Sequence, residues 1–271
     1  MNKLNISALI ISKNEEKMIG RALESLSFVD EVIVIDAEST DRTVEIAKSF
    51  PNVKVIIRPW PGFKAQRNFS LTQAKHDWVL IVDADEAVSL QLQNKLYEMF
   101  DSFVDNEQIK LPFNGYRIRR VEYFHGEPIT ATCWYPSRQD RLLNRHKAKY
   151  INEIHEYPEV EPIDGQTSGN EKGYIDEPLL HHPSFDIEFM LRKINSYTSI
   201  EAHERYKNGE RTSVGKILFA FVGAVFRNFI NYKGYKHGMR GLVISVMDGV
   251  ARTMRHIKLW EIELLEKGKK N

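Results

Sequence analysis

Cysteine is nearly absent from this sequence, because Cys133 is the only one among 271 residues. A single thiol excludes an internal disulfide framework and fits a reducing compartment. No run of 18 consecutive apolar residues occurs, so we expect no transmembrane span. The apolar run near the N-terminus is too short for a signal peptide. Repeats and low-complexity tracts are also missing. What remains is the composition of a globular protein, 42% hydrophobic and 28% charged.

The chain also lacks an overall excess of charge, since its net charge is +1. Residues 205–271 nevertheless contain 14 Lys and Arg against 5 Asp and Glu, whereas the other 204 residues contain 24 against 32. This basic tail predicts contact with something anionic. We expect no nucleic acid there, because the tail lacks interleaved aromatic and basic residues and any recognised nucleic-acid module.

Strands and helices alternate through the first hundred residues. Apolar β-prone runs predict strands at 5–11, 31–35, 53–57 and 78–82. Helical spacing predicts helices over 14–26, from the N-cap candidates Ser39, Thr40 and Asp41 to about 50, and over 64–75. This alternation predicts an α/β fold with a parallel sheet and right-handed crossovers. Ligands bind such sheets at the carboxyl ends of the strands.

Acidic side chains collect where the fourth of these strands ends. Asp83, Asp85 and Glu86 follow the strand with no Gly or Pro between. In an extended chain residues 83 and 85 point the same way, and two close carboxylates repel each other unless a cation lies beside them. A divalent ion that carries phosphate oxygens would resolve the repulsion. A solvated acidic loop is the plainer alternative.

The pattern changes from about residue 111 onward. Alternation at 116–124 and the sequence Arg141-Leu142-Leu143 predict smaller mixed strands that extend the sheet, and the Glu-, Pro- and Gly-rich residues 158–173 predict a loop. Apolar residues at intervals of three and four predict a helix over 186–207. Residues 217–230 are intensely apolar, and an amphipathic stretch follows at about 241–265.

Four segments together resemble the family 2 glycosyltransferases, which are inverting enzymes of the GT-A fold. They are residues 12–16, 36–43, 65–68 and 82–86, and their order and spacing agree with the family across residues 4–100. The resemblance implies a GT-A catalytic domain over 1–185, with a nucleotide-sugar half at about 1–110 and an acceptor half at about 111–185. A C-terminal helical, basic extension that associates with membranes would follow at 186–271.

The second half resembles a narrower branch that adds glucose or a related hexose to the lipopolysaccharide inner core. This resemblance rests on Arg141-Leu142-Leu143, on His155-Glu156 and on His181, which lies 12 residues before Lys193. It departs from the branch at residues 182–184, where an aromatic-containing stretch would be more usual. It implies transfer of a hexose, with glucose the first choice, from a UDP-sugar to a saccharide or lipid-linked acceptor of the bacterial cell envelope.

The resemblance also implies roles for single residues. The expected nucleotide-sugar-binding residues are Ser12, Asn14, Glu15, Asp36, Arg67, Asp83, Ala84 and Arg141. Asp36 would accept a hydrogen bond from the imide N–H of uracil, with helix capping as its alternative role; Asn14 has the same alternative. Arg67 would donate charge-assisted hydrogen bonds unless it is solvated. Arg141 would orient the acceptor or the diphosphate, with a surface ion pair as the alternative.

The expected metal ligands are Asp85 and His181, and His181 has a structural role as its alternative. Carboxylate with imidazole suits Mn²⁺ better than Mg²⁺, and the ion would neutralise the leaving diphosphate as a Lewis acid. Glu156 is the expected general base, because inversion in one displacement needs a base on the face opposite the diphosphate. Glu86 and Asp140 are the next choices for that role.

The apolar stretches of the basic tail have two possible explanations. Buried core helices explain the apolar stretches of the tail, but the added positive charge favours helices that rest on an anionic inner leaflet. The protein would then be cytoplasmic and peripheral on the plasma membrane.

Two other functions stay open as alternatives. A sugar-nucleotide nucleotidyltransferase would share the sheet and the acidic site, yet residues 12–16 contain no Gly, which a phosphate-binding loop would require. A catalytically inactive nucleotide-sugar-binding protein is the other alternative.

Overall fold

The computed structural model describes residues 3–105, 108–152, 156–163, 172–183 and 186–268. The chain divides into two compact units. The sheet unit comprises residues 1–121 and 137–183, and the helical unit comprises residues 122–136 and 184–271. Residues 122–136 thus group with the helices that follow residue 184, and the functional division at residue 185 stays a prediction.

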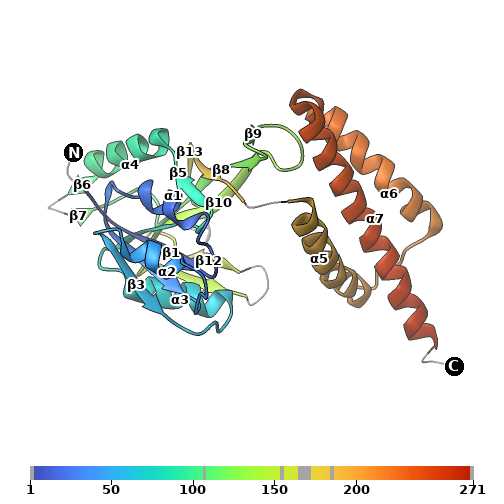
Figure 1. Ribbon diagram of the computed structural model, residues 1–271, viewed down its shortest axis with the longest axis horizontal. Helices are drawn as coiled ribbons and strands as arrows, with labels where there is room; N and C mark the ends of the chain where they lie inside the picture. The colour runs from blue at the N-terminus through green and yellow to red at the C-terminus, as the bar shows by residue number, and fades with distance from the viewer. Residues whose placement is uncertain (1–2, 106–107, 153–155, 164–171, 184–185, 269–271) are drawn as a thin grey trace. The chain divides into compact units, whose positions relative to one another are not determined.

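A nine-stranded mixed sheet contains the predicted strands (Figure 1). Its order is β3-β2-β1-β4-β10-β8-β13-β5, with β9 paired to β8. The parallel strands are β1 (Leu4–Ser12), β2 (Val29–Asp36), β3 (Val53–Ile57) and β4 (Trp78–Ile81). The others are β5 (Glu86–Val88), β8 (Gly115–Phe124), β9 (Glu127–Ile129), β10 (Ser137–Asn144) and β13 (Gly173–His181). The parallel half is therefore confirmed, and the antiparallel β10 extends it beyond β4.

Both faces of the parallel strands are buried, as their continuous apolar sequences predict. Ile6, Ala8 and Ile10 contribute to one core cluster, and Leu9 contributes to the other. Four helices belong to this unit: α1 (Ile19–Glu24), α2 (Thr43–Lys48), α3 (Phe63–Gln73) and α4 (Leu90–Ser102). The first cluster includes the buried side chains of α1 and α4, and the second includes Leu71 of α3.

Two predicted helix starts are wrong, because side chains hold the chain in other conformations there. The first helix begins at Ile19, since Asn14 has a left-handed φ of 56° and its backbone N–H donates to the Ser39 hydroxyl. The second begins at Thr43, and neither Ser39 nor Thr40 caps it. Of the predicted caps only Asp41 accepts from the N–H of Thr43, at 3.0 Å.

The predicted loop at 158–173 contains a strand. β12 (Tyr157–Val160) pairs antiparallel with β11 (Ala148–Ile151), and its residues alternate between exposed and buried. Asn68 of α3 fixes β11, because its side chain bonds both the N–H and the C=O of Tyr150 at 2.9 Å. Residues 164–171 of the predicted loop lie outside the described residues. A second short hairpin pairs β6 (Val104–Asp105) with β7 (Gln108–Ile109).

The helical unit is built from α5 (Ile187–Lys207), α6 (Val214–Phe226) and α7 (Gly238–Gly268). A π-helical turn at Arg227–Asn231 and a 3-10 turn at Gly234–His237 connect α6 to α7. The predicted helix at 186–207 is confirmed. Gly249 lets α6 approach α7, because a Cβ there would lie 2.8 Å from Phe221. Within the described residues, Val214–Asn231 is long and apolar enough to cross a membrane by length and composition alone, so the expectation of no span is not confirmed.

Candidate functional site

Asp83 lies between two buried arginines. Arg67 of α3 donates to one carboxylate oxygen and Arg141 of β10 donates to the other. Each arginine is only 6% exposed, so neither is the solvated or surface residue that the sequence left open. Burial acts to raise the pKa of Asp83, but the guanidinium groups of Arg141 and Arg67 outweigh it and hold that pKa well below its usual range. The two guanidinium groups therefore already balance the negative charge of Asp83 and relieve the repulsion expected between Asp83 and Asp85.

Glu86 closes the turn that follows β4. Its carboxylate accepts from the N–H of Asp83 at 3.0 Å, and its own N–H donates to the Asp83 carbonyl at 2.9 Å. The other oxygen accepts from Arg141 at 2.6 Å and from Arg120 at 3.3 Å. The chain turns at residues 84–85, so the extended geometry expected for Asp83 and Asp85 is wrong. Glu86 is 1% exposed and acts as a structural acid.

Asp85 meets His181 in this turn. The Nε2 of His181 lies 3.0 Å from the Oδ2 of Asp85, and the Asp85 carbonyl accepts from the N–H of His182 at 2.8 Å. β13 pairs with β5 so that His181 lies opposite Glu86, which explains how residues so distant in sequence meet. Both side chains keep some contact with solvent.

The donor pair formed by Asp85 and His181 fits one divalent ion. Neighbouring positions of an octahedron with bonds of about 2.1 Å lie about 3 Å apart, close to the observed Nε2–Oδ2 separation of 3.0 Å. Among the described residues, no group of three or more His, Cys, Asp or Glu is arranged to hold a metal. An ion bound here would therefore take its remaining ligands from substrate or water.

Asp36 organises the neighbouring strand ends. It is fully buried at the end of β2, and it accepts from the hydroxyls of Ser12 at 2.9 Å and Ser39 at 2.6 Å. Ser12 is its register partner on β1. Asn14, in the loop after β1, also bonds the loop after β2, because its side-chain oxygen accepts from the N–H of Thr40 at 2.8 Å. These bonds join the loops after β1 and β2, and they replace the helix-capping roles left open for Asp36 and Asn14.

The pKa of Glu15 depends on burial and on the acidic residues of the turn. Burial raises the pKa of Glu15 to about 7, with further contributions from Asp85, Asp41 and Asp83. Its backbone N–H donates to the Thr43 hydroxyl at 2.7 Å. Glu15 therefore lies close enough to this turn for its charge to depend on the carboxylates there.

The structure brings together most of the predicted site residues, in three groups. They are Ser12 with Asn14 and Asp36, Arg67 with Asp83 and Arg141, and Asp85 with His181. Ala84 is buried in the turn. Glu156 is half-buried directly before β12, while His155 lies outside the described residues. Within the described part of the chain, no hydrogen bond or ion pair connects Glu156 to these groups.

Two partners within the site were not assigned to it from the sequence. Ser39 was expected as a helix cap, yet its hydroxyl and its N–H both donate to Asp36. The signal was its position three residues after Asp36, which is typical of local side-chain bonding at a turn. Arg120 reaches Glu86 from β8, and an arginine in an alternating strand carries no signal for such a contact.

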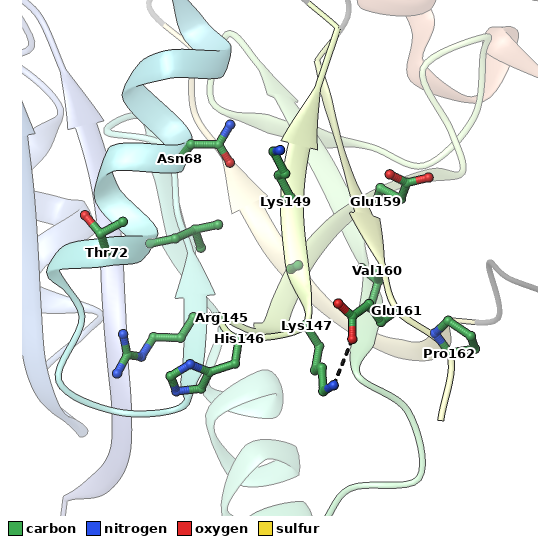
Figure 2. A pocket seen from close by; sticks show the side chains of 12 residues that line it. Asn68, Thr72, Arg145, His146, Lys147, Lys149, Glu159, Val160, Glu161 and Pro162 are labelled. Atoms are coloured by element: carbon green, nitrogen blue, oxygen red, sulfur yellow. Dashed lines mark hydrogen bonds and ion pairs between the residues drawn. The ribbon is translucent and has the colours of Figure 1, made fainter. Parts of the chain in front are cut away.

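A cavity of about 820 Å³ lies at the opposite edge of the sheet (Figure 2). Its lining residues are Asn68, Leu71, Thr72, 145–149 and 159–162. The N–H of Arg145 donates to the carbonyl of Asp77, directly before β4, which places the cavity at the amino ends of the parallel strands. Charged groups on its rim pair within the protein, since Lys147 lies 2.8 Å from Glu161. None of the predicted site residues is among those lining residues.

Comparison with known proteins points to one family. The model of the family described as "Glycosyl transferase family 2" matches residues 7–153. An uncharacterized glycosyltransferase of Rickettsia bellii is 32% identical over 263 residues, which are 96% of this chain and 87% of that protein. The lipopolysaccharide core biosynthesis glycosyltransferase LpsC of Rhizobium meliloti is 28% identical over 269 residues, 94% of each chain. The solved structure of S. aureus TarS with UDP-GlcNAc aligns with a TM-score of 0.49 at 14% identity, over 92% of this chain and 82% of that one.

The raised pKa of Glu15 predicts a pH-dependent stability. The folded state binds this proton more tightly than the unfolded state, so the free energy of unfolding falls as the pH rises from 4.5 to about 7 and then levels off. Glu15→Gln removes this loss, so we expect the variant to gain stability over the wild type above pH 7 and to lose that gain below pH 4.5. Urea unfolding of the metal-free protein measures the difference.

Glu24→Gln is the matched control for this experiment, because Glu24 is an exposed acid on α1. It should follow the wild type at every pH. Parallel pH profiles for Glu15→Gln and the wild type would contradict the prediction.

Proposed function

Because the chain belongs to glycosyl transferase family 2 and has the GT-A fold, we propose that it transfers a hexose, with glucose the first choice, from a UDP-sugar to a saccharide or lipid-linked acceptor. Transfer proceeds with inversion, in assembly of the lipopolysaccharide core or a related cell-surface glycan. The observation that carries the proposal is that Asp36 ends β2 while Asp83 and Asp85 follow β4, at the same carboxyl edge of a parallel sheet in which β1 lies between these two strands. The likeness to LpsC supports the choice of acceptor class.

The donor nucleotide occupies the loops after β1 and β2. Asp36 accepts the imide N–H of uracil in exchange for one of the hydrogen bonds that Ser12 and Ser39 donate to it, since both of its oxygens are already engaged. Asn14 and Glu15 contact the nucleoside from the loop after β1. Asp83, held by its two arginines, faces the ribose.

Asp85 and His181 hold a divalent cation, with Mn²⁺ the first choice and Mg²⁺ the second. The mixed oxygen and nitrogen donors support Mn²⁺; the two side chains now bond each other at 3.0 Å, and an ion would replace that contact. When bound, the ion supplies neutralising charge to the leaving diphosphate. The buried arginines stay committed to Asp83 and Glu86 and keep the acidic turn in place around it.

Substitution of the imidazole tests the cation site. His181→Ala should weaken Mn²⁺ binding in the presence of UDP by at least about tenfold, because one of two protein ligands is lost. Isothermal titration of the UDP-saturated protein with MnCl₂ measures the affinity. His146→Ala is the matched control in the same unit, at the rim of the distant cavity, and should bind Mn²⁺ normally. Equal Mn²⁺ affinities for His181→Ala and the wild type would show that His181 is not a ligand of the ion.

Glu156 acts as the general base. It takes the proton of the acceptor hydroxyl while that oxygen forms a bond to C1 of the sugar, and the C1–O bond to UDP breaks on the opposite face. General-base assistance of this kind is typically worth about 10²–10⁴-fold. The buried Glu86 is unsuited to this role because both of its oxygens are engaged in the turn.

Removing the base tests both the mechanism and the activity. The wild type should release UDP from a UDP-hexose when an acceptor is supplied, and Glu156→Gln should bind the donor normally but lose about 10²–10⁴-fold in transfer rate. Glu159→Gln, on the exposed side of β12, is the matched control and should keep full activity. Near wild-type turnover by Glu156→Gln would reassign the base. A wild type that binds the donor but never releases UDP would favour the inactive binding protein.

The helical unit holds the enzyme on the inner face of the plasma membrane. Along α6, Val214, Leu218, Val222 and Phe226 follow one another at four-residue intervals and are 72%, 64%, 63% and 58% exposed. Phe219 beside them is 75% exposed. A continuous exposed apolar face of this kind is uncommon on a soluble monomer and is typical of an interaction surface. α6 packs on α7 through a different set of side chains, among them Phe221 and Val225 beside Gly249.

Charge around α6 supports an anionic lipid surface as the partner. Residues 205–240 contain eight Lys and Arg and a single acidic residue, and each basic residue near such a surface contributes about 1 kcal/mol. Arg227 and Asn228 both bond Asp248 of α7, at 3.3 and 2.6 Å. These polar contacts at the end of the apolar stretch favour a helix that lies in the plane of the interface over one that crosses the membrane.

Liposome binding separates the apolar and electrostatic contributions. The wild type should co-sediment with vesicles of phosphatidylglycerol and phosphatidylcholine, and added salt should weaken binding because it screens the charges. Lys233→Glu with Lys236→Glu should reduce binding at low salt, and Leu218→Ser with Val222→Ser should reduce it at every salt concentration. Lys149→Glu, in the sheet unit, is the control. Binding that is unaffected by salt and by both double variants would exclude this surface.

A further inference from the structure

Arg141 occupies an extra position in β10. Across from β8, Asp140 pairs with Arg117 and Leu142 pairs with Tyr116, so Arg141 has no register partner on that strand. An additional residue of this kind is a β-bulge, which bends the strand and redirects a side chain. Beyond the bulge β10 pairs with β4, the strand that leads to Asp83. The bulge therefore lies where the direction of the Arg141 side chain decides whether it reaches the acidic turn.

A buried ion pair lies directly beside the bulge. The Nζ of Lys172 is 3.0 Å from the Oδ2 of Asp140, and it also donates to the carbonyl of Pro158 at 2.7 Å. The side chain of Lys172 is only 3% exposed, and a lysine this deeply buried is rare unless it is paired. The other oxygen of Asp140 accepts from the Nε of Arg117 at 3.2 Å. Asp140 is therefore held by β8 and by the residue directly before β13, and a carbonyl of β12 in turn holds Lys172.

The next residue shows that the chain is packed tightly at this point. A Cβ on Gly173 would lie 2.3 Å from the ring of Tyr116, the residue that pairs with Leu142. Only glycine allows β13 to pass this close to β8. Lys172 is therefore placed by a constrained backbone, so its ammonium group is delivered to Asp140 at a fixed position.

We propose that Asp140 and Lys172 are positioning residues that hold the β10 bulge and so aim Arg141 at Asp83 and Glu86. This inference rests on the proposed function and assigns the pair to its donor site. Arg141 bonds both acids of the turn, Asp83 and Glu86. A small displacement of β10 would therefore withdraw its guanidinium group from both carboxylates. Misplacement by 1 Å can cost about 10²-fold in rate even when its cause lies away from the chemistry. The pair acts through Arg141 and does not touch the donor.

The test replaces both partners at once. Lys172→Met alone leaves the Asp140 charge buried without its ammonium partner, which can prevent folding. Asp140→Asn combined with Lys172→Met is neutral and should fold, as urea unfolding checks. We expect this paired variant to lose about 10²-fold in kcat/KM for the UDP-hexose and to bind the donor more weakly in isothermal titration. The exposed pair Lys147→Met with Glu161→Gln is the matched control and should change neither quantity.

A double-mutant cycle with Arg141→Lys separates positioning from general stability. If the pair acts through Arg141, its replacement should weaken donor binding in the wild-type background and change it less than about twofold in the Arg141→Lys background. Equal losses in both backgrounds would overturn the proposal, and so would a folded paired variant with wild-type donor affinity. A crystal structure of the paired variant gives a readout that needs no donor. Arg141 displaced from Asp83 supports the inference, and Arg141 with both contacts intact overturns it, even if the wild type proves not to bind UDP-sugars.

Discussion

The acidic turn after β4 exists because buried arginines neutralise it. Asp83 receives one guanidinium from a helix and another from an antiparallel strand, and the second also serves Glu86. Desolvation makes each isolated charge costly, and removal of one partner from a buried pair typically costs about 3–5 kcal/mol. The two arginines therefore link α3, β10 and the turn into one unit. This unit leaves Asp85 free to pair with His181 at the solvent side of the turn.

The parallel half of the sheet could be predicted from the sequence because its signals are local. Continuous apolar strands separated by helical periods predict that β1 to β4 run parallel, and the rule that ligands bind at carboxyl ends then places Asp36 and Asp83 at one edge. Both inferences need only the pattern of residues along the chain. The likeness to a known family added Arg67, Arg141 and His181, which no local pattern identifies.

Other features depend on particular side-chain bonds or on a strand partner, and they were missed for that reason. The extended geometry expected at residues 83–85 failed because Glu86 folds back on the N–H of Asp83, a bond that strand propensity does not encode. The helix predicted from residue 14 begins at Ile19, because Asn14 and Ser39 bond each other across the two loops. The strand at β12 was hidden by a Pro- and Glu-rich composition, although its alternation becomes clear once β11 is its partner.

Consecutive residues of α3 serve two different parts of the molecule. Arg67 is bound to Asp83, while Asn68 bonds the backbone of Tyr150 on both sides. One 11-residue helix therefore fixes the position of the acidic turn and that of the hairpin formed by β11 and β12 together, because two neighbouring residues bond one each.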